Sequence, residues 1–478
     1  MFGRCGKLVL SSLLAAAPLL GDAQFTTLGS QDGISVEAHA LNDLGQVAGT
    51  GRRAVLWRAG TLLDLGTLGG SWSSASALND SGQVVGVSET ATGASHAFLW
   101  ESGAMQDLGT PGGASSSAVA VNDARQVAGN GTTAGGASHA FLWSAGTLTD
   151  LGTLGGASSA ATALGAAGQV VGESATATGD THAFLWQAGT MLDLGTLGGA
   201  TSRATAVNAA GQVVGDSTTA TGDTHAFLWQ AGTMLDLGTL GGTTSRATAV
   251  NAAGQVVGES AIGPPEVARE GAVSGETHAF LWQAGTMQDL NAFPLLAFPY
   301  LAPYSGATAV NALGEATGLS RFAPHTYHSI RWGLAGPMQD VGTCSGTPQG
   351  SSQGVAINDF GQITGSCPPM LGSFFADVSS AAKAQRLTIF FERMVAMGAL
   401  TGLGPDSVAG ARIAALGGMI GSVEGLVAQG QLLDACQPLH DAALRMDGRP
   451  RPPDFATGPA LPRLRALIGN LQGALGCD

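Results

Sequence analysis

The sequence predicts a mainly β protein: an eight-bladed β-propeller closed by its N-terminal strand and followed by a small α-helical bundle. Three observations predict this fold. Tryptophan recurs every 43 residues from Trp57 to Trp229, each repeat carries four short apolar runs, and helical periodicity replaces the strand pattern near Ser379. Four strands in about 43 residues is the size of one propeller blade.

The four runs of each repeat, called segments a to d, have the composition of buried strands. In one repeat they are ATAVN (204–208), GQVVG (211–215), HAFLW (225–229) and MLDLG (234–238). The Asn-x-x-Gly between a and b predicts a tight turn. Continuous runs such as Val-Val and Phe-Leu-Trp indicate strands buried on both faces, as in blades that stack around an axis.

The order of the segments predicts closure of the ring. A d segment at 25–29 precedes every a, b and c, whereas no d follows the last c at 372–376. The N-terminal strand is therefore expected to complete the last blade and to remove an open edge. Residues 24–377 give about 44 residues for each of eight blades. An open β-solenoid is only the second interpretation, because a solenoid would not show this permutation of its segments.

The first 23 residues have the pattern of a secretory signal peptide. Arg4 and Lys7 precede an apolar run at 8–20, and small residues lead to a cleavage point near Ala23. The mature chain is expected to be secreted or on the cell surface, with the periplasm as an alternative. Nothing after residue 25 is expected to form the helix of about 20 apolar residues that spans a membrane.

Cleavage leaves four cysteines, and an even number outside the cytoplasm predicts disulfides. Pairing Cys344 with Cys367 and Cys436 with Cys477 is the simplest arrangement, because each pair lies within one region of the chain.

The charge of the chain excludes two classes of partner. Lys and Arg number 20 against 34 Asp and Glu, which gives a formal net charge of −14. Nucleic acid and anionic membrane surfaces require a basic face, so neither is an expected partner.

The repeat resembles the bacterial extracellular HAF-repeat family over residues 25–376. His-Ala-Phe-Leu-Trp recurs unchanged in five consecutive repeats, together with Asn-x-x-Gly-Gln-Val-Val-Gly and Leu-Gly-Thr-Leu-Gly-Gly. The repeats at 53–57, 328–332 and 372–376 depart from this pattern. The resemblance implies secretion and a propeller-like repeat; it supplies no reaction and no catalytic residues.

Residues 378–478 are expected to form a separate α-helical domain. Leu387, Phe390 and Met394 lie at helical spacing, and further helices are predicted from 405, over 432–445 and over 461–475. Part of residues 385–445 is similar to helical modules of the FIMAH type that end some secreted repeat proteins.

The repeated histidines that open segment c are predicted to be structural. Zinc requires three or four ligands about 2 Å from one ion, whereas equivalent positions on neighbouring blades lie further apart. Each histidine is instead expected to tie its own hairpin by a hydrogen bond. We expect no metal, no cofactor and no catalytic residue.

Ligand contacts are expected where the repeat is interrupted. Long, aromatic loops occupy residues 262–275, 291–306 and 321–328, and such loops on a rigid scaffold are frequent binding sites. Exposed aromatic side chains stack on sugars or anchor a protein partner. The candidate ligand-binding residues are Arg269, Phe298, Tyr300, Tyr304, Arg321, His325 and Tyr327.

These patterns favour a secreted, non-catalytic binding or surface-interaction protein whose ligand is an extracellular glycan or protein. A secreted polysaccharide hydrolase or lyase with its site on the same loops is the alternative. Carboxylates gathered on the axial pocket would favour the enzyme, whereas exposed Tyr and Phe without them would favour binding. A third interpretation assigns the contact to the helical domain. The ligand and the oligomeric state stay open.

Overall fold

The computed structural model describes residues 24–263, 276–291, 304–333, 338–343, 350–367, 372–447, 454–458 and 460–477. The expected signal peptide lies outside these residues, as do Arg269, Phe298, Tyr300 and Cys344.

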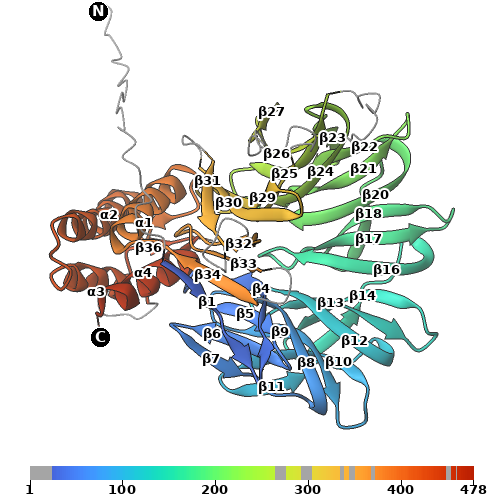
Figure 1. Ribbon diagram of the computed structural model, residues 1–478, viewed down its shortest axis with the longest axis horizontal. Helices are drawn as coiled ribbons and strands as arrows, with labels where there is room; N and C mark the ends of the chain where they lie inside the picture. Colours follow the sequence, from blue (N-terminus) through green and yellow to red (C-terminus); the bar gives the residue numbers. More distant parts are fainter. Residues whose placement is uncertain are drawn as a thin grey trace, which may run out of the picture.

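The protein is mainly β, with four helices at its C-terminal end (Figure 1). The β region repeats one four-stranded antiparallel unit of the kind found in β-propellers. The first complete units are β4 (Glu37–Leu41), β5 (Val47–Thr50), β6 (Ala54–Arg58) and β7 (Thr61–Asp64); β8 (Gly69–Leu78), β9 (Val84–Thr90), β10 (Ser95–Glu101) and β11 (Ala104–Asp107); and β12 (Gly112–Val121), β13 (Val127–Thr133), β14 (Ser138–Ser144) and β15 (Thr147–Asp150).

Three further units are joined into one 12-stranded sheet. The joins are single parallel pairings, Thr181 with Thr201 and Thr224 with Thr244. The strands are β16 (Gly155–Leu164), β17 (Val170–Thr176), β18 (Thr181–Gln187), β19 (Thr190–Asp193), β20 (Gly198–Val207), β21 (Val213–Thr219), β22 (Thr224–Gln230), β23 (Thr233–Asp236), β24 (Gly241–Val250), β25 (Val256–Ile262), β26 (Thr277–Gln283) and β27 (Thr286–Asp289).

The last two units bring the ends of the β region together. One is β28 (Ser305–Val310), β29 (Ala316–Ala323), β30 (Thr326–Trp332) and β31 (Gln339–Gly342). The other combines β32 (Gln353–Ile357), β33 (Ile363–Ser366) and β34 (Ser373–Asp377) with β1 (Gln24–Thr27) from the start of the chain. β1 pairs antiparallel with β34, with Phe25 opposite Ala376. A short hairpin, β2 (Ser30–Gln31) and β3 (Ile34–Ser35), follows β1.

The repeated polar residues link each unit to the next. The first strands of successive units lie beside one another, and β32 lies beside β4. At their ends the Asn42 side-chain amide donates to the carbonyl oxygen of Asn79 at 3.0 Å, and Asn358 donates in the same way to Asn42. The repeated asparagine therefore both shapes its own turn and binds the neighbouring one.

Apolar layers fill the spaces between the units, as the continuous apolar runs predict. In one layer Ala48 and Leu56 pack with Val84 and Phe98 of the next unit, and all four are buried. Because both faces of a unit are covered, its central strands contain continuous apolar runs such as Ala97–Trp100 in β10.

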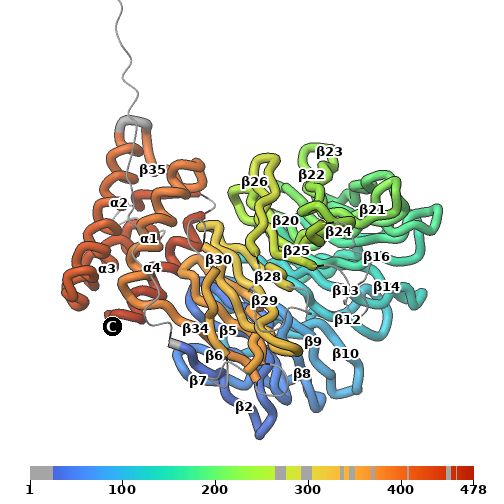
Figure 2. The backbone as a smooth tube through the Cα atoms, turned by 45° about the horizontal axis from the view of Figure 1, so that its top comes forward, coloured from blue at the N-terminus to red at the C-terminus, as the bar shows by residue number. Residues whose placement is uncertain are grey.

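The helices form a bundle on one side of the β region (Figure 2). They are α1 (Ser380–Ala396), α2 (Asp406–Ala428), α3 (Cys436–Leu444) and α4 (Leu461–Leu475), with β35 (Thr401–Gly402) and β36 (Ala456–Thr457) paired between them. Ser379 caps α1, accepting a hydrogen bond from the backbone of Ala382. The expected disulfide between Cys436 and Cys477 is confirmed. Cys367 is also a disulfide cysteine, whereas Cys344 lies outside the described residues.

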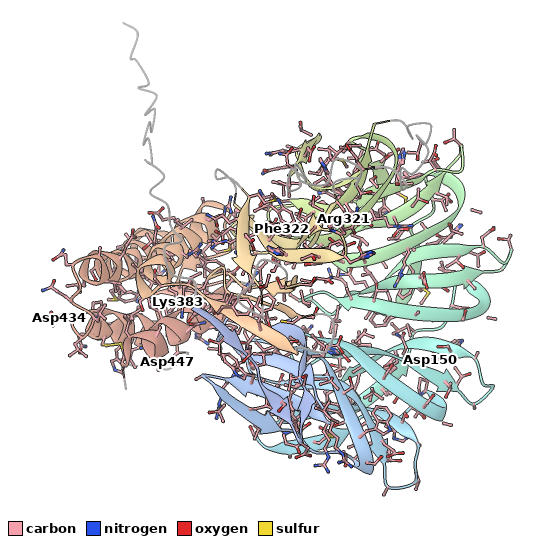
Figure 3. The ribbon with its side chains drawn as sticks, in the orientation of Figure 1. Asp150, Arg321, Phe322, Lys383, Asp434 and Asp447 are labelled. Atoms are coloured by element: carbon pink, nitrogen blue, oxygen red, sulfur yellow. A yellow bond between two sulfur atoms is a disulfide. The ribbon has the colours of Figure 1, made fainter. Side chains whose placement is uncertain are left out.

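The bundle packs on the end of the β region that carries the turns between the first and second strands of the units. Leu313 and Phe360 lie in two of these turns and belong to the same apolar core as α1 and α4. In Figure 3, Lys383 lies at this junction and Asp434 at the outer edge of the bundle. We call this end the turn end; the opposite end, with the loops between second and third strands, is the loop end.

Helix α2 corrects one expectation. Val408–Ala428 is long and apolar enough to cross a membrane, with a mean hydropathy of 1.3. Of its most apolar 18-residue stretch, 22% is buried inside the protein. Its Ala, Val, Ile and Leu residues raise the mean hydropathy although five glycines interrupt them. One such helix is weak evidence for a membrane segment, because the helices of small bundles pass the same test.

Candidate functional site

Three of the predicted binding residues lie together at the loop end. Tyr304 immediately precedes β28, while Arg321 on β29 and Tyr327 on β30 face each other across the hairpin of the same unit. The Arg321 guanidinium lies 5.9 Å from the ring centroid of Tyr304 and 5.6 Å from that of Tyr327. It also donates to the Tyr327 hydroxyl at 3.2 Å. We call these three residues the rim cluster.

A carboxylate fixes one side of the rim cluster. The Tyr304 hydroxyl donates to Glu259 Oε2 at 2.8 Å, and the Tyr304 and Tyr327 rings meet edge to face at 6.2 Å. Burial, followed by the adjacent Glu259 charge, raises the pKa of Tyr304 above its ordinary value, so the phenol stays protonated. The rings are half-buried and held in place, which reduces the entropy lost when they bind a ligand.

Two neighbouring side chains extend the rim cluster to solvent. Phe322 is 38% exposed and stacks on His328 with ring centroids 4.2 Å apart. Arg321 and Phe322 lie next to each other on the gold strands in Figure 3. His325 is exposed in the turn at the tip of the hairpin, with φ +59°. The predicted Arg269, Phe298 and Tyr300 lie outside the described residues.

The repeated histidines are structural, as predicted. The His96 imidazole pairs with Asp107 at 2.8 Å, and His139, His182, His225, His278 and His328 each pair with an aspartate of the following strand. Each pair ties the third strand of a unit to its fourth. Among the described residues, no three His, Cys, Asp or Glu side chains are placed to hold one metal ion.

A pocket of about 290 Å³ lies at the turn end, and the residues that line it were not predicted from the sequence. It lies where the first strands of several units end, and its lining includes Leu41, Asn42, Asp43, Leu78, Asn79, Asp80, Val121, Asn122, Asp123, Leu164, Ala166, Ile357, Asn358 and Arg463. The first strands meet at the centre of the β region, so we call this the axial pocket.

Aspartates of successive turns form one side of the axial pocket. The backbone N–H of Asp43 donates to Asp80 at 2.8 Å, that of Asp80 donates to Asp123 at 3.2 Å, and that of Asp359 donates to Asp43 at 2.9 Å. The equivalent turn residues of the other units are alanines: Ala166, Ala209, Ala252 and Ala312. The acidic side of the axial pocket is therefore confined to four adjacent turns.

Arg463 of α4 reaches this acidic side. Its Nε lies 3.2 Å from Asp43 and its Nη2 lies 2.5 Å from Asp359. Asn470, two turns further along α4, donates to the carbonyl oxygen of Asp43 and to Gln362. One face of α4 thus binds the turns that carry the aspartates.

Burial raises the pKa of Asp80, Asp123 and Asp359 despite the neighbouring cation. The pKa of Asp80 rises to about 8, mainly by desolvation and then by the Asp43 charge. Desolvation likewise raises the pKa of Asp359 to about 7, with Arg463 opposing the shift, and raises the pKa of Asp123. At neutral pH the Asp80 carboxyl therefore holds a proton, as a general acid does.

The sequence carried a signal for the axial pocket that a single repeat does not reveal. Asn-Asp occurs in only four of the turns, and its distribution around the β region becomes visible only when the repeats are compared position by position. Trp72 is a second omission: it occupies the repeat position of Tyr304 and is 37% exposed. Arg463 had no such signal, because its role depends on where α4 docks.

The fold and the two sites define a propeller-type β scaffold with a docked helical bundle. No protein family and no curated protein sequence matches the chain.

Several solved β-propeller proteins are similar to this chain in fold. They include a putative TolB from Agrobacterium tumefaciens (11% identity, 57% of this chain and 87% of that one, TM-score 0.31). The β-propeller domain of the trilobed protease from Pyrococcus furiosus is 7% identical over 62% of this chain and 89% of that one (TM-score 0.37). The BP39L lectin from Burkholderia pseudomallei is 14% identical over 64% and 98% (TM-score 0.34). At these values the likeness carries no argument about activity.

Proposed function

We propose that this chain is a secreted, non-catalytic binding protein of the HAF-repeat type, built on an eight-bladed, closed β-propeller. The ligand contacts the loop end, at the rim cluster of Tyr304, Arg321 and Tyr327. The observation that carries the proposal is the Arg321 guanidinium fixed against both tyrosine rings, next to the exposed ring of Phe322.

Contacts between the two ends of the β region support the closed ring. β1 completes the sheet of β32, β33 and β34, and Asn358 and Asp359 donate to the turn of Asn42 and Asp43 just as other turns bind their neighbours. The disulfide between Cys436 and Cys477 supports an oxidising compartment, where such bonds persist.

The rim cluster has the composition of a recognition surface. Tyrosine and arginine dominate the residues that carry binding energy at protein surfaces, and aromatic faces also stack on sugar rings. It lies at the end of the β region opposite the helical bundle, so the bundle leaves it uncovered. An extracellular glycan or protein is the expected ligand.

The proposal is tested on arrays of glycans and matrix proteins with residues 24–478. We expect a Tyr304→Ala, Tyr327→Ala variant to lose at least tenfold in affinity for whichever ligand binds. A Leu192→Ala, Leu235→Ala variant is the control, because it removes two exposed apolar side chains from β19 and β23. Unchanged binding by a folded tyrosine variant would move the site elsewhere, and no binding on any array would contradict the binding function.

A polysaccharide hydrolase or lyase is the second candidate, and the axial pocket favours it. Carboxylates do line this pocket, and Asp80 holds a proton near neutral pH. However, three of these carboxylates already accept backbone hydrogen bonds, and Arg463 pairs with two aspartates. Release of new reducing ends from any arrayed polysaccharide would replace the binding proposal with this one.

A further inference from the structure

Two arginines occupy the same repeat position in adjacent units of this acidic protein. Arg203 on β20 lies opposite Asp216, and Arg246 on β24 lies opposite Glu259. Both arginines lie on first strands, where the units meet. The other units carry no cation at this position: Glu37, Ser74, Ser117, Ala160, Gly306 and Gln353.

The two guanidinium groups are more exposed than the carboxylates that pair with them. The Arg203 and Arg246 side chains are 55% and 60% exposed, against 37% for Glu173 and 30% for Glu259. Their nearest carboxylate oxygens lie 3.7 and 4.0 Å away, so within the described chain these are ion pairs without a hydrogen bond. An approaching ligand therefore meets N–H donors first and carboxylates underneath.

A chain of contacts connects these arginines to the rim cluster. Glu259 lies between Arg246 and the Tyr304 hydroxyl, and Tyr304 in turn contacts Arg321. On the other side, burial raises the pKa of Asp216, and the charges of Arg246 and Arg203 both oppose this shift. The three arginines thus form one row across three adjacent units, which we call the arginine row.

We propose that the arginine row binds the carboxylate groups of an acidic, polyuronate-type glycan while its sugar rings stack on Tyr327. The inference rests on the proposed function and names its ligand class. Planar guanidinium groups match carboxylates in bidentate geometry, and charge-assisted pairs are about twice as strong as neutral hydrogen bonds. The net charge of −14 disfavours the binding of a polyanion away from local groups of arginines such as this row.

The test measures the binding of fluorescent oligogalacturonate and of its carboxyl-reduced counterpart to residues 24–478. We expect the reduced oligomer to bind at least about tenfold more weakly, and an Arg203→Gln, Arg246→Gln variant to lose about tenfold for oligogalacturonate only. The matched control, Arg58→Gln with Arg465→Gln, removes the same charge from exposed arginines elsewhere and is expected to stay within about twofold.

The outcomes separate this inference from the proposed function. Equal affinity for the two oligomers, or equal losses in the row and control variants, would overturn the arginine row. Binding of a neutral glycan or a protein that needs Tyr304 and Tyr327 but not Arg203 and Arg246 would do the same and leave the proposed function standing. No binding of any array ligand would remove both.

Discussion

At the residue scale, Asp80 is the side chain whose titration matters most. Its carboxyl is mostly buried, faces the axial pocket, and accepts the backbone N–H of Asp43. Asp43, Asp123 and Arg463 are the charged groups that act on it. Its pKa of about 8 lies far above the ordinary 3.8, so between these pH values the folded chain holds a proton that the unfolded chain releases. The free energy of unfolding therefore decreases as pH rises through this window.

An Asp80→Asn substitution is expected to remove that pH dependence. Asparagine keeps an oxygen that accepts from Asp43 but does not ionise. One pKa unit corresponds to about 1.4 kcal/mol. We therefore expect the free energy of unfolding of the variant, relative to that of the wild type, to increase by at least about 1 kcal/mol from pH 5 to pH 8. Urea unfolding at the two pH values measures this difference. Asp434→Asn, at the outer edge of the bundle (Figure 3), removes an exposed carboxylate and is the control. Parallel pH profiles for wild type and Asp80→Asn would contradict the expectation.

At the element scale, helix α2 contains more glycine than its own packing requires. A Cβ at Gly410, Gly418, Gly421 or Gly425 would meet nothing within 4 Å. Glycine in a helix interior is less favourable than alanine by about 1 kcal/mol, because the unfolded chain loses more freedom. These four positions therefore weaken the helix without an internal steric reason.

Gly418→Ala and Gly421→Ala are each expected to stabilise the bundle by about 1 kcal/mol, measured by urea unfolding followed by far-UV circular dichroism. Gly417→Ala is the matched contrast on the same helix. Its Cβ would lie 2.8 Å from the Phe391 ring, so this change is expected to destabilise. Destabilisation by Gly418→Ala would contradict this expectation.

At the scale of the whole molecule, the sequence predicted the features that depend on residues close together in the chain. The helix over 461–475 has the expected bounds, and the third helix, expected over 432–445, spans Cys436–Leu444. The first strands are longer than the apolar runs indicate: in Gly69–Leu78 the first half, Gly-Gly-Ser-Trp-Ser, is mostly exposed. Period-based reasoning detects only the part of a strand that is buried on both faces.

The difference between local and long-range contacts also explains which site residues the sequence predicted. Tyr304, Arg321 and Tyr327 belong to one unit, so a local break in the repeat was enough to select them. The contact between Arg463 and Asp43 joins residues 420 positions apart and depends on how two regions dock. No local pattern encodes such a contact.

That docking leads to the last prediction. Asp359 is 0% exposed, and Arg463→Gln would leave it and Asp43 buried without their cation. Removing one partner from a buried pair leaves an uncompensated charge. We therefore expect the free energy that holds the bundle to the β region to decrease by more than about 1 kcal/mol.

Two spectroscopic signals distinguish the two regions. All eight tryptophans lie between Trp57 and Trp332, so tryptophan fluorescence reports on the β region while far-UV circular dichroism also follows the helices. In the wild type the two signals are expected to change together in urea, because Leu313 and Phe360 share the bundle's core. In Arg463→Gln the helical signal should change first, whereas Arg465→Gln, exposed two residues further along α4, should behave as the wild type. Coincident transitions in Arg463→Gln would mean that apolar packing alone holds the bundle to the turn end.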